Sequence, residues 1–586
     1  METGKKQGRI TTIKVALLLL FTGMVCLSAK MLFAGFPADE EYQLVMSYRL
    51  ATGDRLFTEV WDTIQTSGFL CAALIRVYLS LTGTSTGIVV FLRACGLVLQ
   101  ALTALLLYHT LKRHTAKWYA CLIAIAYYCV FTKLIAMPDF SNMQSWFLTG
   151  MLCLMFQAAE CDIQGRRNKR ILLLIGAALC YCLAVLSTAC VTLVPVIAVF
   201  LCLLFHKSRR DMLACNAVFF GVCLVTGLGY LGFVVYENGS LASVLTNMAN
   251  TLSGDSTHMS GVNIVGSSKC MTYLKELWKL LCYLAVSAAA AFAFTGWVHR
   301  KKKLADRKFF FYSCWLYLAM LVTLIQWFPM QTGYEGLRLF IPVAAICGAL
   351  SLRGGAKDEP GRMRQVMALF GILIFAGAYV HVLCISNVPL IQNLSFLYGA
   401  CLWGLISLVF TYGAGDRRAS LTGLLVTLGF VVIAGSGYTL SSGAFGSHIF
   451  ELDGIVRNGP AQNCLMSKDA AWVYHTDYET FESVVPKGSN VLIITDFFRN
   501  TSVTSCYLLN DVHISHYSVN STPTFSEKLE EYWQQFPEKT PDVVMVNTHA
   551  VTLKEGDWAA GYLSREFEEA RCLHTENADY YFREKP

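Results

Sequence analysis

Residues 12–42 read TIKVALLLLFTGMVCLSAKMLFAGFPADEEY, an apolar run that ends in three consecutive acids. The run from Ile13 to Phe33 has roughly the twenty residues that a helix needs to cross a bilayer core of about 30 Å. It follows Lys5, Lys6 and Arg9, as the apolar core of a signal peptide would. A cleaved signal peptide would have a shorter core and a small-residue cleavage site. We therefore expect an uncleaved first membrane span with acidic groups at its far end.

Similar apolar runs recur along the whole chain. Hydrophobic residues make up 55% of the 586 residues and charged residues only 15%, and the charges gather in short segments between apolar stretches. This pattern predicts a polytopic α-helical membrane protein with about thirteen spanning helices. We expect the spans at roughly 12–34, 86–110, 118–137, 142–160, 171–187, 190–205, 213–236, 271–296, 309–328, 338–353, 366–385, 394–413 and 420–440.

The basic residues fall mainly on one side of these spans. Such an asymmetry is the positive-inside pattern of cytoplasmic loops. It accounts for the net charge of +7 without nucleic acid as a partner. With an odd number of spans, it predicts a cytoplasmic N-terminus and an extracytoplasmic C-terminal tail in a plasma membrane; short cytoplasmic loops favour a bacterial one. The basic loops contain Lys112-Arg113, Arg166–Arg170, Lys207–Arg210, Arg300–Lys303 and Arg417-Arg418.

Two segments differ from the spans. Residues 35–85 carry apolar side chains at helical spacing on both sides of Gly53-Asp54, which predicts two short amphipathic helices in the outer interface. In the tail, the β-branched runs Val491–Ile494 and Val543–Val546 suit buried strands, with a helical stretch at Ser526–Phe536 between them. We expect a transmembrane domain over 1–440, with 35–85 as its first outer loop, and a small soluble α/β domain over 447–586.

Ionisable residues gather at the outer ends of several spans. Asp39, Glu40 and Glu41 follow the first span, Asp139 lies in a short outer loop, and Arg338 opens the tenth span. Charges at such positions are costly, so they are usually paired or used in function. Structural alternatives remain open for each: a solvated charge for Asp39, a helix N-cap for Asp139, and a side chain that reaches the head groups for Arg338.

The order of these features resembles the GT-C superfamily of membrane glycosyltransferases, and its protein-mannosyltransferase and aminoarabinose-transferase branch in particular. The likeness extends over about residues 12–345, and thirteen helices with an outer C-terminal domain also fit that branch. The segments that carry it are Pro37-Ala38-Asp39-Glu40-Glu41-Tyr42, Arg49-Leu50-Ala51-Thr52-Gly53-Asp54, Arg93-Ala94-Cys95-Gly96, Pro138-Asp139 and Arg338-Leu339-Phe340-Ile341-Pro342.

The resemblance implies transfer of a sugar from a polyprenyl-phosphate donor to a glycan, lipid or protein acceptor at the outer membrane face, with inversion. Asp39 would be the general base, Glu40 would assist, and Asp139 would orient the acceptor or a divalent metal. Arg338 would stabilise the departing lipid phosphate. Further substrate contacts would come from a set of neighbouring residues, namely Glu41, Tyr42, Arg93 and Tyr334.

Two other classes of function remain open. A transporter or flippase also has many helices, but it would be expected to carry charges near the midplane and internal repeats, and neither is evident. A non-catalytic envelope assembly protein is the third class. The sequence shows no metal-binding spacing that would require a cofactor. His513 and His516 in the tail suit an exposed strand better than a metal site, and Cys464, Cys506 and Cys572 leave room for one disulfide in an oxidising compartment.

Overall fold

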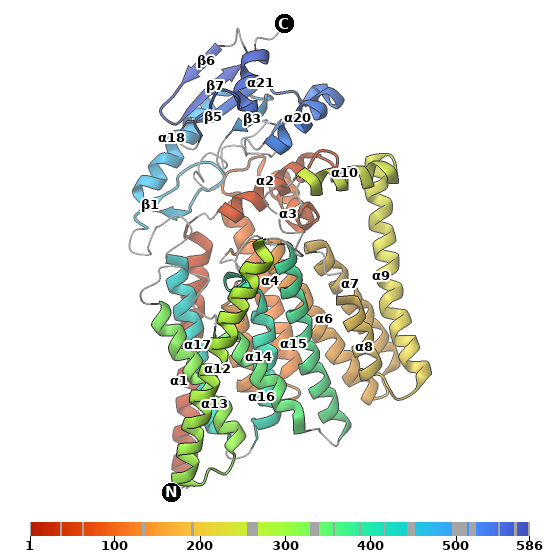
Figure 1. The fold of residues 1–586 in the computed structure, drawn as a ribbon, viewed down its shortest axis with the longest axis vertical. Helices are drawn as coiled ribbons and strands as arrows, with labels where there is room; N and C mark the ends of the chain where they lie inside the picture. The colour runs from red at the N-terminus through yellow and green to blue at the C-terminus, as the bar shows by residue number, and fades with distance from the viewer. Residues whose placement is uncertain are drawn as a thin grey trace.

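The computed structural model shows a bundle of long helices with a small α/β domain at one end (Figure 1). The N-terminus lies at the end of the bundle opposite this domain, and the C-terminus lies at its far tip. The structure describes residues 2–35, 38–60, 64–131, 135–188, 193–254, 268–327, 339–354, 358–385, 390–414, 417–441, 452–494, 513–514, 523–548, 551–567 and 571–583.

Each predicted span overlaps one helix within those residues, although three of these helices have only 11 or 12 residues. Seven of the helices are long and apolar enough to cross a membrane. The other six helices do not meet this criterion of length and composition, so the total of thirteen spans stays a prediction. The helices are α1 (Glu2–Phe33), α4 (Ile88–Leu111), α5 (Lys117–Tyr128), α6 (Phe140–Ile163), α7 (Arg167–Ser187), α8 (Val194–Leu204), α9 (Arg209–Asn238), α12 (Ser268–Lys302), α13 (Arg307–Trp327), α14 (Phe340–Ser351), α15 (Glu359–Ile385), α16 (Tyr398–Tyr412) and α17 (Arg418–Ser441).

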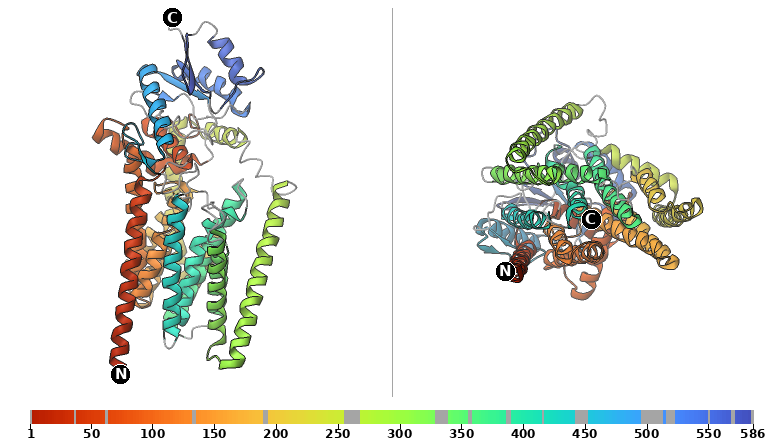
Figure 2. Two further views of the ribbon diagram at one scale, coloured as in Figure 1. Left: turned by 90° about the vertical axis from the view of Figure 1, so that its left-hand side faces the viewer. Right: turned by 90° about the horizontal axis from the view of Figure 1, so that it is seen from below.

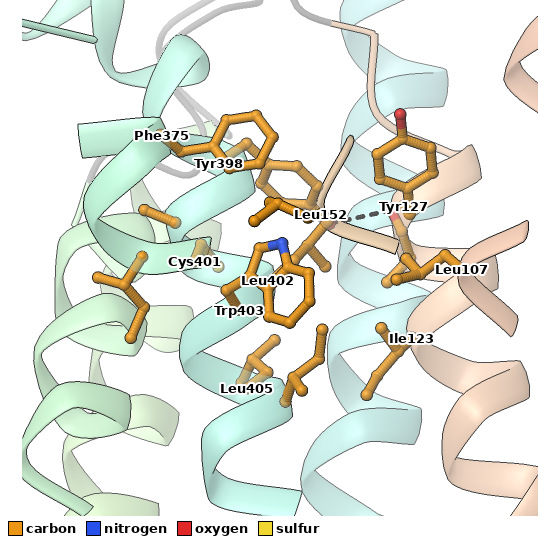
Figure 3. Packing of buried hydrophobic residues seen from close by; sticks show 14 of the residues in the cluster. Leu107, Ile123, Tyr127, Leu152, Phe375, Tyr398, Cys401, Leu402, Trp403 and Leu405 are labelled. Carbon is orange, nitrogen blue, oxygen red and sulfur yellow. Dashed lines mark hydrogen bonds between the residues drawn. The ribbon is translucent and has the colours of Figure 1, made fainter. Parts of the chain in front are cut away.

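The core of the bundle is a single apolar cluster to which most of these helices contribute. Figure 3 shows part of it, with the Trp403 ring of α16 among aliphatic side chains and the Tyr398 hydroxyl donating to the Ala126 carbonyl over 2.9 Å. Helices α14 and α16 approach very closely, because a Cβ at Gly348 would lie 2.3 Å from the Cα of Gly404. Small residues at such crossings let helix backbones pack together in a membrane.

The basic loops lie at the end of the bundle away from the α/β domain, where they pair with acids of neighbouring loops. Arg113 contacts Glu160 at 3.0 Å, and Arg417 contacts Asp306 at 2.7 Å. Arg170, which is largely buried, pairs with Asp162. The first two ion pairs therefore link different loops at this end, as expected if these loops share one side of the membrane.

The outer loop forms the two predicted short helices, α2 (Ala38–Thr52) and α3 (Gly68–Thr82). The chain breaks between them at Gly53, whose φ of +118° favours glycine. Only α3 keeps an exposed apolar face, with Leu81 80% exposed. Helix α2 is buried along most of its length, contrary to the expected position in the lipid interface, because the C-terminal domain packs over it.

The C-terminal domain is the expected α/β unit. A five-stranded sheet has the order β4-β3-β5-β7-β6, with β3, β4 and β5 parallel and the last two strands antiparallel. Helix α18 (Lys468–Val484) covers one face, and α20 (Pro523–Gln535) and α21 (Trp558–Glu566) cover the other. The strands are β3 (Asn490–Ile494), β4 (His513–Ile514), β5 (Val543–Asn547), β6 (Arg571–His574) and β7 (Ala578–Phe582), and a separate hairpin pairs β1 (Gly454–Ile455) with β2 (Leu465–Met466).

The apolar core of this domain continues into the outer loop. One cluster joins Val491 and Tyr580 of the sheet to Leu44 of α2, Cys71 of α3 and Leu92 of α4. A separate cluster holds the helical bundle together. Residues 35–85, which we predicted to belong with the membrane domain, therefore pack with the tail as much as with the helices below.

Candidate functional site

The candidate site lies where α2 meets the outer ends of α1, α4 and α6. Helix α2 begins at Ala38, so its first turn carries the three acids, in the position that a helix N-terminus favours for negative charge. Asp39 lies in this first turn, but its side chain falls outside the described part of the chain, as do Tyr334 and Arg338 entirely. The roles predicted for these three residues therefore stay predictions.

Glu40 forms a buried ion pair with Arg93 of α4. The Arg93 Nε donates to Glu40 Oε1 over 2.8 Å and its Nη2 donates to Oε2 over 2.5 Å. The two side chains are only 2% and 1% exposed. Bidentate pairs of this kind are strong and fix the relative orientation of both groups. Arg93 therefore locks the first turn of α2 onto the start of α4.

The remaining donors of Arg93 are also engaged. Its Nη2 donates to the carbonyl of Gly35 over 2.7 Å, and its Nη1 donates to that of Leu32 over 3.3 Å. Nη1 also lies 3.7 Å from the sulfur of Cys464 in the C-terminal domain. All three nitrogens of the guanidinium thus have protein partners, and the geometry favours a structural task for Arg93 over the predicted contact with substrate.

Asp139 is the N-cap of α6. Its Oδ1 accepts from the Asn142 N–H over 2.9 Å, and its Oδ2 accepts from the Ser141 hydroxyl over 2.6 Å. The residue is 1% exposed. The alternative that the sequence left open, a capping aspartate, is thus the role this geometry gives it. Capping fixes the carboxylate and leaves the acceptor-binding role a prediction.

Cys71 of α3 connects Asp139 with the acids of α2. Its thiol donates to the Pro138 carbonyl over 3.0 Å, one residue before the cap. Burial raises the pKa of Cys71, and the negative charges of Asp139 and Glu40 raise it further. The buried cluster around Cys71 also contains Leu44 of α2 and Met137, two residues before Asp139. The start of α2 and the cap of α6 are neighbours beneath the C-terminal domain.

Gly96 permits the close contact between α4 and the loop before α6. A Cβ at this position would lie 1.8 Å from the carbonyl oxygen of Ala136, so no larger residue fits without movement of the backbone. The Asn142 amide secures the same loop by donating to the carbonyls of Ile135 and Met137. The position of Asp139 thus depends on a glycine that is three residues from Arg93.

Glu41 and Tyr42 complete the first turns of α2. Glu41 is 1% exposed and Tyr42 is half-buried. Both lie in the same layer beneath the C-terminal domain, so their predicted contacts with substrate remain open.

The C-terminal domain is hydrogen-bonded directly to the outer ends of the first two predicted spans. The Gly35 N–H donates to the Leu465 carbonyl over 2.8 Å, directly after α1. Gly87 and Val89, at the start of α4, donate to the carbonyls of Gly459 and Pro460 over 3.0 and 3.2 Å. The segment that includes these acceptors is therefore bonded both to the end of α1 and to the start of α4, the helix that carries Arg93.

A second ionic cluster fixes the other end of α2. Arg49, in the last turn of α2, contacts Asp54 at 2.5 Å, and Lys539 of the C-terminal domain contacts the other oxygen of Asp54 at 2.9 Å. Glu59 forms ion pairs with Arg55 at 2.8 Å and with Lys539 at 3.6 Å. The sequence pointed to Arg49 and Asp54 as a motif, but nothing near Lys539 marked it as their partner. The domain thus holds α2 at both ends.

Neither a metal centre nor a disulfide emerges from the described residues. Within them no group of three or more His, Cys, Asp or Glu side chains is arranged to hold a metal ion. Cys464 and Cys572 are both free thiols, and Cys506, His516 and Asp511 lie outside the described residues. Burial raises the pKa of Cys464 to about 11.

Comparison with known proteins adds no assignment: no protein-family model matches this chain, and no curated protein matches its sequence.

Proposed function

We propose that the protein is a membrane glycosyltransferase that moves a sugar from a polyprenyl-phosphate donor to an acceptor at the membrane face on which the C-terminal domain lies. The proposal is supported by the location of two acidic segments. The acidic first turn of α2 and the capping carboxylate of α6 both lie at the end of the bundle next to the C-terminal domain. One buried cluster joins Leu44 of α2 with Met137, two residues before Asp139, and the Cys71 thiol donates to the Pro138 carbonyl over 3.0 Å, so the two acidic segments pack against the same neighbours.

Asp39 is the general base in this proposal. Its neighbour Glu40 is held by Arg93, which fixes the start of α2 and so limits where the side chain of Asp39 can go. The acceptor hydroxyl attacks the anomeric carbon and Asp39 takes its proton. The bond between that carbon and the phosphate oxygen breaks, and the lipid phosphate leaves with the electron pair.

Glu40 and Arg93 are positioning residues in this scheme, since their hydrogen bonds are directed at each other and at backbone carbonyls. Asp139, whose carboxylate caps α6, orients the acceptor in this proposal. Arg338 remains the proposed contact with the leaving phosphate, for which a guanidinium offers paired donors. A plasma membrane location and about thirteen spans belong to the same proposal.

The test uses the purified full chain in nanodiscs with a panel of radiolabelled polyprenyl-phosphate sugars. We expect loss of label from the lipid with at least one donor, and we expect Asp39→Asn to reduce that rate by about 10²–10⁴-fold, the usual contribution of a general base. Asp469→Asn is the matched control, because Asp469 is exposed on α18 and should leave the rate unchanged.

Two results would overturn the proposal. One is wild-type transfer by a folded Asp39→Asn protein, which would remove the general base. The other is the absence of transfer with every donor, combined with movement of the intact lipid between leaflets, which would indicate a flippase.

A further inference from the structure

The C-terminal domain exposes two large apolar side chains among those that the structure describes in it. Ile455 of β1 is 48% exposed and Trp472 of α18 is 55% exposed. Single exposed apolar residues are common on protein surfaces. These two are notable for their shared location.

Both side chains lie beside the junction of β1 with the start of α18. Asp453, which directly precedes β1, accepts from the backbone N–H of Lys468 over 3.0 Å and pairs with its ammonium at 3.4 Å. Lys468 begins α18 and lies one helical turn before Trp472. We call Ile455, Lys468 and Trp472 the tail patch; it combines an aliphatic group, an aromatic ring and an exposed cation.

The height of the tail patch relative to the bundle follows from backbone contacts. Leu465, the partner of Ile455 in the hairpin, is bridged to Ala34 directly after α1. The same segment binds Gly87 and Val89 at the beginning of α4. Ile455 is thus one strand spacing, about 4.8 Å, from Leu465, which itself lies beside Ala34 at the end of a candidate membrane span.

The hairpin and the start of α18 project beyond the bundle. In the view from below, the light-blue part of the C-terminal domain extends past α1 (Figure 2). Helix α3, whose Leu81 is 80% exposed, ends near the same segment, because its Tyr78 and Gln462 of the domain both lie close to Gly87. The projecting part therefore extends beyond the side of the bundle at the level of the span ends.

We propose that the tail patch rests on the lipid head groups of the adjacent membrane leaflet. Tryptophan and lysine are the residues that favour this interface, where the ring lies among the head groups and the ammonium remains in water. A second copy or another protein fits less well, because two apolar side chains offer far less than the roughly 800 Å² that each partner contributes to a stable interface.

The test uses the unmodified full chain in nanodiscs that contain a phospholipid with a diazirine near its head group. After illumination, mass spectrometry locates the labelled peptides. We expect label in residues 452–473 as well as at the span ends, and only background label in residues 571–582, which include β6 at the far side of the domain. The double variant Ile455→Ser, Trp472→Gln should lose the label at 452–473 and retain it at the spans.

Background label at 452–473, with normal label at the spans, would overturn the proposal. Benzoylphenylalanine at position 472 supplies a second measurement: a lipid adduct supports the contact, whereas an adduct with another polypeptide assigns the patch to a protein partner. His574, which is well exposed on β6, is the matched control position and should give neither adduct. The result is independent of glycosyl transfer, since no substrate takes part.

Discussion

Replacement of Arg93 by methionine should release the first turn of α2. The substitution keeps much of the side-chain volume but leaves Glu40 buried without its cation. The geometry sets the magnitude: the pair is almost completely buried and bidentate, with distances of 2.5 and 2.8 Å. Removal of one partner of such a pair costs about 3–5 kcal/mol, whereas an exposed pair contributes about 0–1 kcal/mol.

Hydrogen exchange of peptides from residues 38–52 measures this cost locally, without requiring that the whole membrane protein unfold in two states. Since 1.4 kcal/mol corresponds to a factor of ten, we expect exchange in α2 to accelerate by about two to nearly four powers of ten in Arg93→Met. Glu40→Gln should have a smaller effect, because the amide oxygen can still accept from Arg93, whose guanidinium also keeps the carbonyls of Leu32 and Gly35 as partners. The double variant should lose less than the sum, with a coupling of about 1–3 kcal/mol.

Arg565→Met is the matched control, because Arg565 pairs with Glu530 at 2.7 Å but both side chains are well exposed. Exchange in its own helix, α21, should change by less than about a factor of five. Equal effects of Arg93→Met and Arg565→Met would refute the reasoning, as would additive effects of the two substitutions in the Glu40–Arg93 cycle.

Three further predictions concern the same region. Gly96→Ala should lower the free energy of unfolding by about 1–3 kcal/mol or more, because the methyl group forces α4 away from the loop before α6. The melting temperature should fall accordingly. Gly221→Ala should leave the melting temperature unchanged, because nothing lies within 4 Å of the added methyl group. Lys539→Ala should destabilise the contact between the C-terminal domain and the outer loop by about 1–2 kcal/mol, which proteolysis of the loop would report as a faster rate. Lys539→Arg should keep the slower rate of the wild type. Equal rates in the wild type and both variants would exclude the ionic contact. Cys464 should resist alkylation at pH 8, because burial raises its pKa to about 11 and keeps the thiol neutral. Above about pH 9 the same thiol ionises in the unfolded chain but not in the folded one, so the folded state should lose stability as the pH rises toward 11. Peptide mapping after alkylation checks the last point, and rapid labelling of the folded protein would contradict it.

Much of the architecture follows from interactions within short segments. A span is recognisable because its length and composition must match the bilayer core, and every predicted span overlaps a helix, seven of which are long and apolar enough to cross a membrane. The break at Gly53, the strands Val491–Ile494 and Val543–Val546 and the capping role open to Asp139 are local as well. Each depends on a few neighbouring residues, so the order of amino acids alone was sufficient to predict them.

Contacts between distant segments were decided only in the folded chain. Glu40 and Arg93 are 53 positions apart, and Arg93 and Cys464 are 371 apart. Nothing in the local pattern selects these partners, because buried charges pair with whichever opposite charge the packing brings near. The same holds for Lys539 and Asp54, and for the burial of α2 by a domain that begins some four hundred residues later. The sequence alone thus determined which segments become helices and strands, while tertiary packing determined which carboxylates are held by cations and which segments the C-terminal domain covers.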